Sequence, residues 1–107
     1  MISVIIVSWN ARRHLENCLN SLRAHGGPLV REVIVVDNAS TDGSAEMVER
    51  LFPEVRLIRA AENLGFARAN NLGLRQATGS LLALINSDVV VHPHCFERLA
   101  RVMETQP

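Results

Sequence analysis

Four short apolar runs alternate with four segments of helical periodicity along this chain, and that alternation restricts its possible folds more than any other feature. A run that is apolar throughout predicts a strand buried on both faces, and such strands belong to parallel sheets covered by helices on both sides. Right-handed crossovers connect the strands of such a sheet. The sequence therefore predicts an α/β fold with a mostly parallel sheet and helices on both faces.

The boundaries of the expected elements follow from the apolar runs and from helix-capping residues. We expect strands at 2–8, 33–36, 55–58 and 81–85. Asn10 is expected to cap the first helix and Ser44 the second. We expect a third helix at 66–77 and a last helix opened by Pro93. The side chains expected to face inward from the first, second and last helices are Leu15, Cys18, Leu19, Leu22, Met47, Val48, Leu51, Phe52, Phe96, Leu99, Ala100 and Met103.

Length and composition indicate a single domain at 1–107. A chain of 107 residues with 48% hydrophobic residues can build one core and has no room for a second complete domain. Eleven arginines balance eleven acidic residues, so no overall field favours a nucleic acid as partner. The apolar start is much shorter than a membrane span and lacks a basic leader, which predicts no span in this segment and a cytoplasmic protein.

The cysteine spacing argues against a metal site, and the residues after the first strand argue against two other classes of nucleotide-dependent enzyme. Cys18 and Cys95 lack metal-ligand spacing, and Cys18 shares helical spacing with leucines, so we expect a reduced thiol packed in a core. A dinucleotide-dependent oxidoreductase would need Gly-x-Gly-x-x-Gly after the first strand, where this chain has Ser-Trp-Asn-Ala-Arg-Arg. A nucleotidyltransferase would want a glycine-rich loop and a lysine there, and the chain contains no lysine.

Polar residues gather directly after the apolar runs. In parallel sheets, ligands bind outside the carboxyl ends of the strands, where helix N-termini also present free N–H groups. Asp37 follows four uninterrupted apolar residues, so its carboxylate lies at the rim and can accept a hydrogen bond from a base. An Asx turn that stabilises the next loop is an equally weighted alternative. The segments expected at this edge are 8–10, 37–44, 61–63 and 86–88.

Two further segments carry candidate ligands for a diphosphate. Asp88 follows the fourth strand, and Mg²⁺ takes only one or two protein carboxylates and fills its other positions with phosphate oxygens and water. We therefore expect a metal to bind there mainly together with a diphosphate, with a plain polar turn as the alternative. Gly65 allows close backbone approach at a helix start, and Arg68 can donate to a diphosphate or stack on a base. The alternatives leave Arg68 in solvent and use Gly73 for tight helix packing.

Four fragments in order resemble the inverting glycosyltransferases of family 2, and they span nearly the whole chain. They are Ile-Ile-Val-Ser-Trp-Asn at 5–10, Val-Val-Asp-Asn-Ala-Ser-Thr-Asp-Gly-Ser at 35–44, Glu-Asn-Leu-Gly-Phe-Ala-Arg-Ala-Asn-Asn at 62–71 and Leu-Ile-Asn-Ser-Asp at 84–88. The resemblance implies that the chain is the Rossmann-like half of a GT-A fold.

The resemblance also implies roles for particular residues. Asp37 would accept from the imide N–H of a pyrimidine, and Asp88 would hold the Mg²⁺ or Mn²⁺ bound to the donor diphosphate. Asn86 offers a neutral oxygen where the Asp-any-Asp motif of this family commonly has a carboxylate. The residues that the resemblance places around the nucleotide are Ser8, Trp9, Asn10, Asp37, Asn63, Gly65, Arg68, Asn86 and Ser87.

As a whole protein, such a chain is expected to be a hexosyltransferase acting in bacterial cell-surface polysaccharide synthesis. The donor would be a dTDP- or UDP-sugar, with dTDP-rhamnose first because the Asn-containing motif resembles rhamnosyltransferase-like members, and the acceptor a glycan or lipid-linked sugar. The catalytic base is expected beyond residue 107, so this N-terminal, truncated portion would be inactive alone. The alternative is a non-catalytic nucleotide-sugar-binding or interaction module from a truncated or degenerate enzyme. The expected location is the cytoplasm, including the inner face of the membrane.

Overall fold

The four strands form one parallel sheet in the order β3-β2-β1-β4, which confirms the predicted fold class. The computed structural model describes residues 1–105 and the side chains of residues 1–103. Its elements are β1 (Ile2–Ser8), α1 (Arg12–His25), β2 (Val30–Asp37), α2 (Ser44–Leu51), β3 (Arg56–Arg59), α3 (Phe66–Gln76), β4 (Leu81–Asn86) and α4 (Cys95–Thr105). Within the described residues, no helix is long and apolar enough to cross a membrane.

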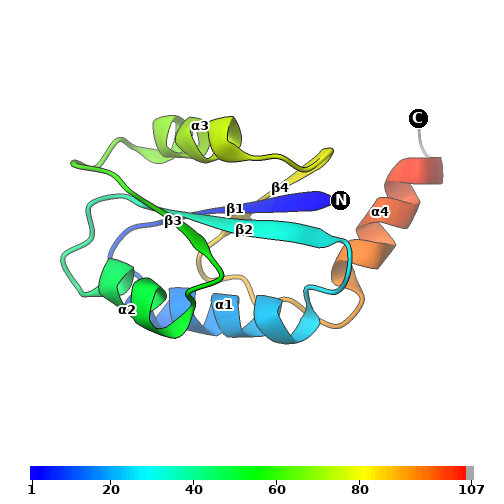
Figure 1. The fold of residues 1–107 in the computed structure, drawn as a ribbon, viewed down its shortest axis with the longest axis horizontal. Helices are drawn as coiled ribbons and strands as arrows, with labels where there is room; N and C mark the ends of the chain where they lie inside the picture. The colour runs from blue at the N-terminus through cyan, green and yellow to red at the C-terminus, as the bar shows by residue number, and fades with distance from the viewer. Residues whose placement is uncertain (106–107) are drawn as a thin grey trace.

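The sheet lies between two helical layers, with α1 and α2 on one face and α3 on the other (Figure 1). The strands start at the end that carries the N-terminus, so their carboxyl ends all emerge at the opposite edge. Alternate residues of β1 divide between the layers: Val4 and Ile6 join the core under α1 and α2, whereas Ile5 lies against α3. Helix α3 approaches the sheet closely because Gly73 has no side chain; a Cβ there would lie 2.6 Å from Ile5 Cγ2.

Strand β2 begins at Val30, three residues earlier than predicted from the apolar run. The apolar run did not predict residues 30–32 as strand because Arg31 and Glu32 are polar, and a charged carboxylate is not expected inside a buried strand. Glu32 Oε2 accepts hydrogen bonds from Ser3 Oγ at 2.6 Å, Thr78 N at 2.7 Å and Thr78 Oγ1 at 2.9 Å. These bonds, led by that from Ser3, hold the pKa of Glu32 below its ordinary value and join three segments at the amino edge of the sheet.

Neither predicted helix cap is formed. Helix α1 starts after Ala11 and α2 after Gly43, and neither start has a side-chain cap at that position. Asp42 serves both helices instead: its Oδ2 accepts from Arg12 N at 3.0 Å and its Oδ1 from Ser44 N at 3.0 Å. One carboxylate in the loop after β2 therefore replaces two local caps.

The prediction that Leu99 and Met103 of the last helix face inward is wrong. Phe96 is buried, but Leu99 and Met103 are 53% and 57% exposed. Figure 1 shows the reason: α4 leaves the sheet and extends past the end where the strands start. Leu51 at the end of α2 is also exposed, at 39%. Strand β4 departs from the pattern as well, because α3 covers β1 and β2 and leaves Leu82 and Leu84 exposed.

Both cysteines are free, and Cys18 is fully buried in the core under α1, as expected from its helical spacing. Burial, with a smaller contribution from the Asp88 carboxylate, raises the pKa of the Cys18 thiol to about 11. Cys95 at the start of α4 is only half-buried.

The close approach at Gly73 predicts the sign of a stability change. Alanine in place of an interior helical glycine ordinarily stabilises a helix by about 1 kcal/mol. In Gly73→Ala the new methyl group would meet Ile5, and such overpacking costs about 1–3 kcal/mol. We expect a lower free energy of unfolding in urea, whereas Asn71→Ala at an exposed position of α3 leaves it unchanged or higher. A more stable Gly73→Ala variant would contradict this packing.

The two thiols are expected to differ in reactivity. At pH 8 a thiol with a pKa of about 11 is ionised in roughly one molecule in a thousand, and burial further blocks reagent access. Ellman's reagent should therefore titrate Cys95 in the native protein and Cys18 only after unfolding. Cys95→Ser is the control, and rapid labelling of that native variant would show that Cys18 is accessible.

Candidate functional site

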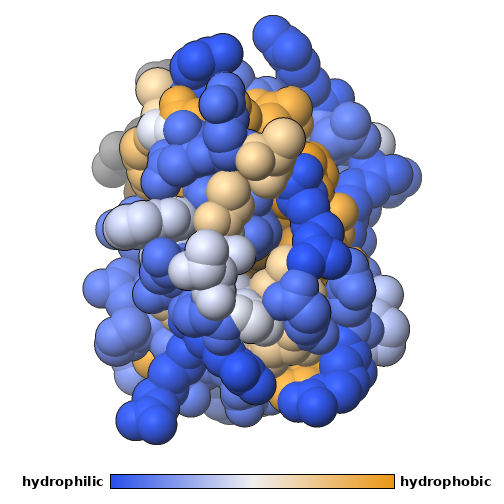
Figure 2. Space-filling view, turned by 90° about the vertical axis from the view of Figure 1, so that its left-hand side faces the viewer, coloured by the Kyte–Doolittle hydropathy of each residue, from blue (hydrophilic) through white to orange (hydrophobic). Residues whose placement is uncertain are grey.

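The candidate site lies at the carboxyl edge of the sheet, where β1 and β2 end side by side. Their last residues, Ser8 and Asp37, are partners in the strand register, and Asn38 N donates to Ser8 O at 2.8 Å. Figure 2 looks onto this edge, where hydrophilic groups frame a strip of less polar residues. The sheet thus brings together two of the residues that the sequence analysis selected.

Two buried polar atoms at this edge have no hydrogen-bond partner: Ser8 Oγ and Asp37 Oδ1. Both residues are almost fully buried, with 1% and 3% of their surface exposed. Leaving such an atom unpaired costs about 1–3 kcal/mol, so it calls for an explanation. The other Asp37 oxygen, Oδ2, accepts from Ser40 N at 3.1 Å. The two alternatives for Asp37 are therefore compatible, because one oxygen forms the turn and the other is free for a ligand.

The loops after β1 and β2 are tied together by Asn10. Its Oδ1 accepts from Thr41 N at 2.8 Å, and its backbone N–H donates to Ser40 Oγ at 2.9 Å. Asn10 and Ala39 both have positive φ, at 48° and 64°. Non-glycine residues rarely adopt this conformation, which recurs at functional sites when the surroundings fix it. The edge is thus held in one shape by contacts between loops distant in sequence.

Asp42 lies in the same loop as Asp37 but in the opposite situation, because both of its oxygens are hydrogen-bonded. Burial alone would raise the pKa of this carboxyl, yet the hydrogen bonds from Ser44 and Arg12 outweigh it and hold the pKa below its ordinary value. Its satisfied state assigns Asp42 to the structure of the loop. The unpaired oxygen of Asp37 distinguishes the two carboxylates.

Asn38 is a positioning residue that the sequence analysis missed. It is buried, and its side chain holds the loop before α3: Oδ1 accepts from Leu64 N at 2.7 Å, and Nδ2 donates to Gly65 O at 3.3 Å. No local pattern in the sequence reveals this role, because the partners of Asn38 are 26 and 27 positions away. Asn63 supports the same loop through a 2.9 Å bond from Gly65 N to its Oδ1.

Gly65 is required by its backbone conformation. Its φ of 79° lies in the left-handed region, while a Cβ built there meets nothing within 4 Å. The space beside Gly65 is open. Trp9, at the end of β1, is likewise exposed, at 56%. Open space beside Gly65 and an exposed aromatic ring at the same edge are features that suit the binding of a planar ligand.

The predicted metal segment follows β4 at the same edge. Asn86 ends that strand and pairs in register with Val7, and a turn at 87–88 carries Ser87 and the exposed Asp88. The Asp88 carboxylate makes the smaller contribution to the raised pKa of the Cys18 thiol, after burial. In the described part of the chain, no three His, Cys, Asp or Glu residues gather as a metal site. The role of Asp88 as a metal ligand stays a prediction.

Arg68 lies on the side of α3 that faces away from the sheet. The residues of α3 that face the sheet are Ala69, Asn70 and Gly73, and all three are buried. Arg68 instead lines a hollow of about 280 Å³ on the outer side of α3, together with Leu64, Asn71, Leu72 and Arg75. Arg68 is exposed, and its predicted contact with a nucleotide stays a prediction.

Comparison with known proteins identifies the family. The model for the family described as glycosyl transferase family 2 matches residues 3–107. Glycosyltransferase AglE of Haloferax volcanii is 32% identical over 101 residues, which cover 91% of this chain and 33% of AglE. Succinoglycan biosynthesis protein ExoO of Rhizobium meliloti is 33% identical over 104 residues, 96% of this chain and 29% of ExoO. The chain thus spans about a third of the length of these relatives.

Solved structures agree. TarS 1–349 of S. aureus, in complex with UDP-GlcNAc, superposes with a TM-score of 0.85 at 27% identity, over 97% of this chain and 31% of that one. The mannosyltransferase PcManGT of Pyrobaculum calidifontis, in complex with GDP-Man and Mn²⁺, gives a TM-score of 0.73 at 33% identity, over 81% of this chain and 27% of that one. These likenesses match the sheet to the Rossmann-like half of the GT-A fold. With the family model covering nearly all of its length, the chain belongs to glycosyl transferase family 2.

Proposed function

We propose that the carboxyl edge binds the nucleoside diphosphate of a sugar donor, and that the whole protein transfers this sugar to a saccharide or lipid-linked acceptor. The observation that carries the proposal is the unpaired Oδ1 of Asp37, buried beside the unpaired hydroxyl of Ser8. A buried carboxylate oxygen without a donor is satisfied by a ligand that supplies an N–H group. The TarS and PcManGT complexes support this assignment, since each holds a nucleotide sugar.

The number of unpaired atoms favours a pyrimidine. The imide N–H of uracil or thymine can donate to Asp37 Oδ1, while the Ser8 hydroxyl can donate to a neighbouring carbonyl oxygen of the base. Guanine offers two adjacent donors, of which the second would share Asp37 Oδ2 with Ser40 N. We therefore propose a dTDP- or UDP-sugar, with dTDP-rhamnose as the first donor to test. Trp9, Asn10, Asn63 and Gly65 would shape the surrounding loops.

Asp88 would hold a Mg²⁺ or Mn²⁺ ion together with the donor diphosphate, with Asn86 and Ser87 offering neutral oxygens beside it. When bound, such an ion neutralises charge on the departing diphosphate. The proposed reaction is an in-line displacement at the anomeric carbon, in which a base deprotonates the acceptor hydroxyl. We place that base in the part of such transferases that this chain does not span, so the chain alone is expected to transfer no sugar.

One feature favours a second candidate, a module that binds nucleotide sugars without catalysis. Asn86 stands where a first carboxylate would strengthen the metal site, and its amide carries no charge. Both candidates require nucleotide binding at Asp37. They differ at Asp88, because only the enzyme requires metal-dependent binding of the diphosphate.

Asp37→Asn separates binding from stability. Losing a hydrogen bond to a charged acceptor costs about 1.5–3 kcal/mol, which lowers affinity for UDP or dTDP roughly 10- to 100-fold in calorimetry. The melting temperature should not fall, because the amide carries no charge to bury and its oxygen can still accept from Ser40 N. Asp42→Asn is the matched control in the same loop: it disturbs satisfied hydrogen bonds, so it should lower the melting temperature and largely preserve affinity in the folded protein. Equal nucleotide affinity of Asp37→Asn and wild type would exclude the proposed site.

Metal dependence tests Asp88. We expect Mn²⁺ to raise the affinity of the wild-type chain for UDP about tenfold or more, since one charged contact is worth roughly 1.5–3 kcal/mol. Asp88→Ala should abolish this gain while retaining metal-free binding. Glu62→Ala, which removes an exposed acid from the loop before α3, should retain the gain. If Asp88→Ala still responds to Mn²⁺ like wild type, the metal lies elsewhere.

A further inference from the structure

Asn70 carries a buried amide group that has no hydrogen-bond partner. It lies on the side of α3 that faces the sheet, between Ala69 and Gly73, and is only 6% exposed. Within the part of the chain that the structure describes, its side chain forms no hydrogen bond to another residue. Unlike the unpaired atoms of Ser8 and Asp37, this amide is not completely enclosed, so a ligand can reach it.

Asparagine is an unfavourable residue for the fold at position 70. Asparagine has a lower helix propensity than alanine, and an amide that leaves water without a new partner loses its hydrogen bonds. The other buried residues on this side of α3, Ala69 and Gly73, are small and carry no polar side chain. Such a conflict between a residue and its local structure is expected at functional sites. We therefore looked for a ligand that Asn70 can bind.

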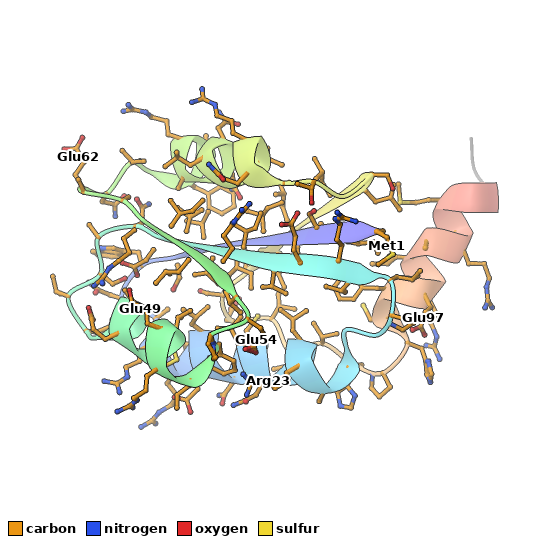
Figure 3. The ribbon with its side chains drawn as sticks, viewed as in Figure 1. Met1, Arg23, Glu49, Glu54, Glu62 and Glu97 are labelled. Carbon is orange, nitrogen blue, oxygen red and sulfur yellow. The ribbon has the colours of Figure 1, made fainter. Side chains whose placement is uncertain are left out.

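Helix α3 places Asn70 at the level where the strands end. The helix starts at the carboxyl edge, because Glu62 lies at the tip of the loop before it, at the opposite end of the molecule from Met1 (Figure 3). Phe66 begins the same sheet-facing side and is 62% exposed, so the first turn extends beyond the sheet. Gly73, two turns along, lies against Ile5 in the middle of β1. Asn70 lies one turn from each, at the rim.

Asn70 also lies on the side of α3 that is nearer to β4. In a right-handed helix that runs antiparallel to these strands, Ala69 and Asn70 lie on opposite sides of Gly73, and Asn70 is on the side of β1 and β4. Val7 of β1 pairs in register with Asn86 of β4 at this level. Asn86 is exposed, because α3 covers β1 and β2 but not β4. The amide of Asn70 therefore borders an open part of the carboxyl edge.

The position along the edge indicates which part of a nucleotide Asn70 would meet. In the proposed function, the base lies at Asp37, where β1 and β2 end, and the diphosphate lies at Asp88, after β4. The ribose connects these two groups, so it would lie over the ends of β1 and β4, beside Asn70. A ribose hydroxyl group both donates and accepts hydrogen bonds, as an amide does. A diphosphate is an anion, for which a cationic side chain is the stronger partner.

We propose that Asn70 binds the ribose hydroxyl groups of the donor nucleotide. The inference rests on the proposed function, because it requires a nucleotide whose base lies at Asp37. It assigns to α3 a direct contact with the ligand, in addition to the strand ends and loops described above. It also explains why this position of the helix carries an amide instead of a small apolar side chain.

Calorimetry with UDP and with 2′,3′-dideoxy-UDP, which lacks both ribose hydroxyl groups, tests the proposal. Wild type should bind UDP about 3- to 10-fold more tightly than the analogue, as expected for the loss of neutral hydrogen bonds. Asn70→Ala should bind both ligands with the affinity that wild type has for the analogue. Its free energy of unfolding in urea should not fall, because alanine favours the helix. Asn71→Ala, at the neighbouring exposed asparagine, is the matched control and should keep the preference for UDP.

Several results would overturn the proposal. Equal UDP affinity of Asn70→Ala and wild type would show that water, rather than the nucleotide, pairs with this amide. An equal loss of affinity for UDP and for the analogue would make Asn70 a structural residue. Asn70→Ser is a second variant if Asn70→Ala does not fold.

Failure of the proposed base site gives a different result. If Asp37→Asn binds UDP like wild type while Asn70→Ala loses the preference for UDP, the assignment of the base to Asp37 is wrong and the ribose contact stands. If Asp37→Asn loses affinity while Asn70→Ala behaves like wild type, the nucleotide site stands and this inference is wrong. Absence of UDP binding to wild type would overturn both.

Discussion

The pairing of β1 with a parallel neighbour on each side is the constraint on which the rest of this structure depends. Because β2 and β4 both run alongside β1 in register, the three strands end at one edge. The residues that follow them are far apart in sequence and become neighbours only through this pairing. At the shared end of β1 and β2, the side chains of Ser8 and Asp37 are buried. Asp37 Oδ2 accepts a hydrogen bond from Ser40 N, whereas Asp37 Oδ1 and Ser8 Oγ have no partner. An unpaired buried polar atom costs about 1–3 kcal/mol, so these two atoms point to a ligand that pairs with them.

The loop after β2 contains one carboxylate that stabilises the fold and another that is available to a ligand. Asp37 and Asp42 are five positions apart, and simple composition does not distinguish them. Asp42 receives backbone N–H groups from the starts of two helices, so its charge is compensated by the fold. Asp37 receives one, and its second oxygen stays buried and unpaired. Hydrogen-bond accounting therefore separates the carboxylate that holds the loop from the one that is available to a ligand.

The features that the sequence predicted well are those decided by local pattern. The apolar runs predicted the positions of the four strands, and helical spacing correctly predicted that Cys18 is buried. The predictions that failed depended on contacts between distant segments. Asn10 and Ser44 are good local caps, yet Asp42 reaches both helix starts from another loop. Leu99 and Met103 form a true apolar stripe, but periodicity does not reveal whether any element lies opposite it. Asn38 was missed for the same reason, since its partners are 26 and 27 positions away.

Helix α3 is seated on the sheet by two contacts that are distant in sequence. The loop before its first turn is held by Asn38, which bonds to the backbone of Leu64 and Gly65, so the helix starts at the edge that carries Asp37. Gly73 then lets the helix approach β1 and β2 closely, because a Cβ there would lie 2.6 Å from Ile5 Cγ2. The shape of the edge beside Asp37 therefore depends on the packing of α3 as well as on the pairing of the strands.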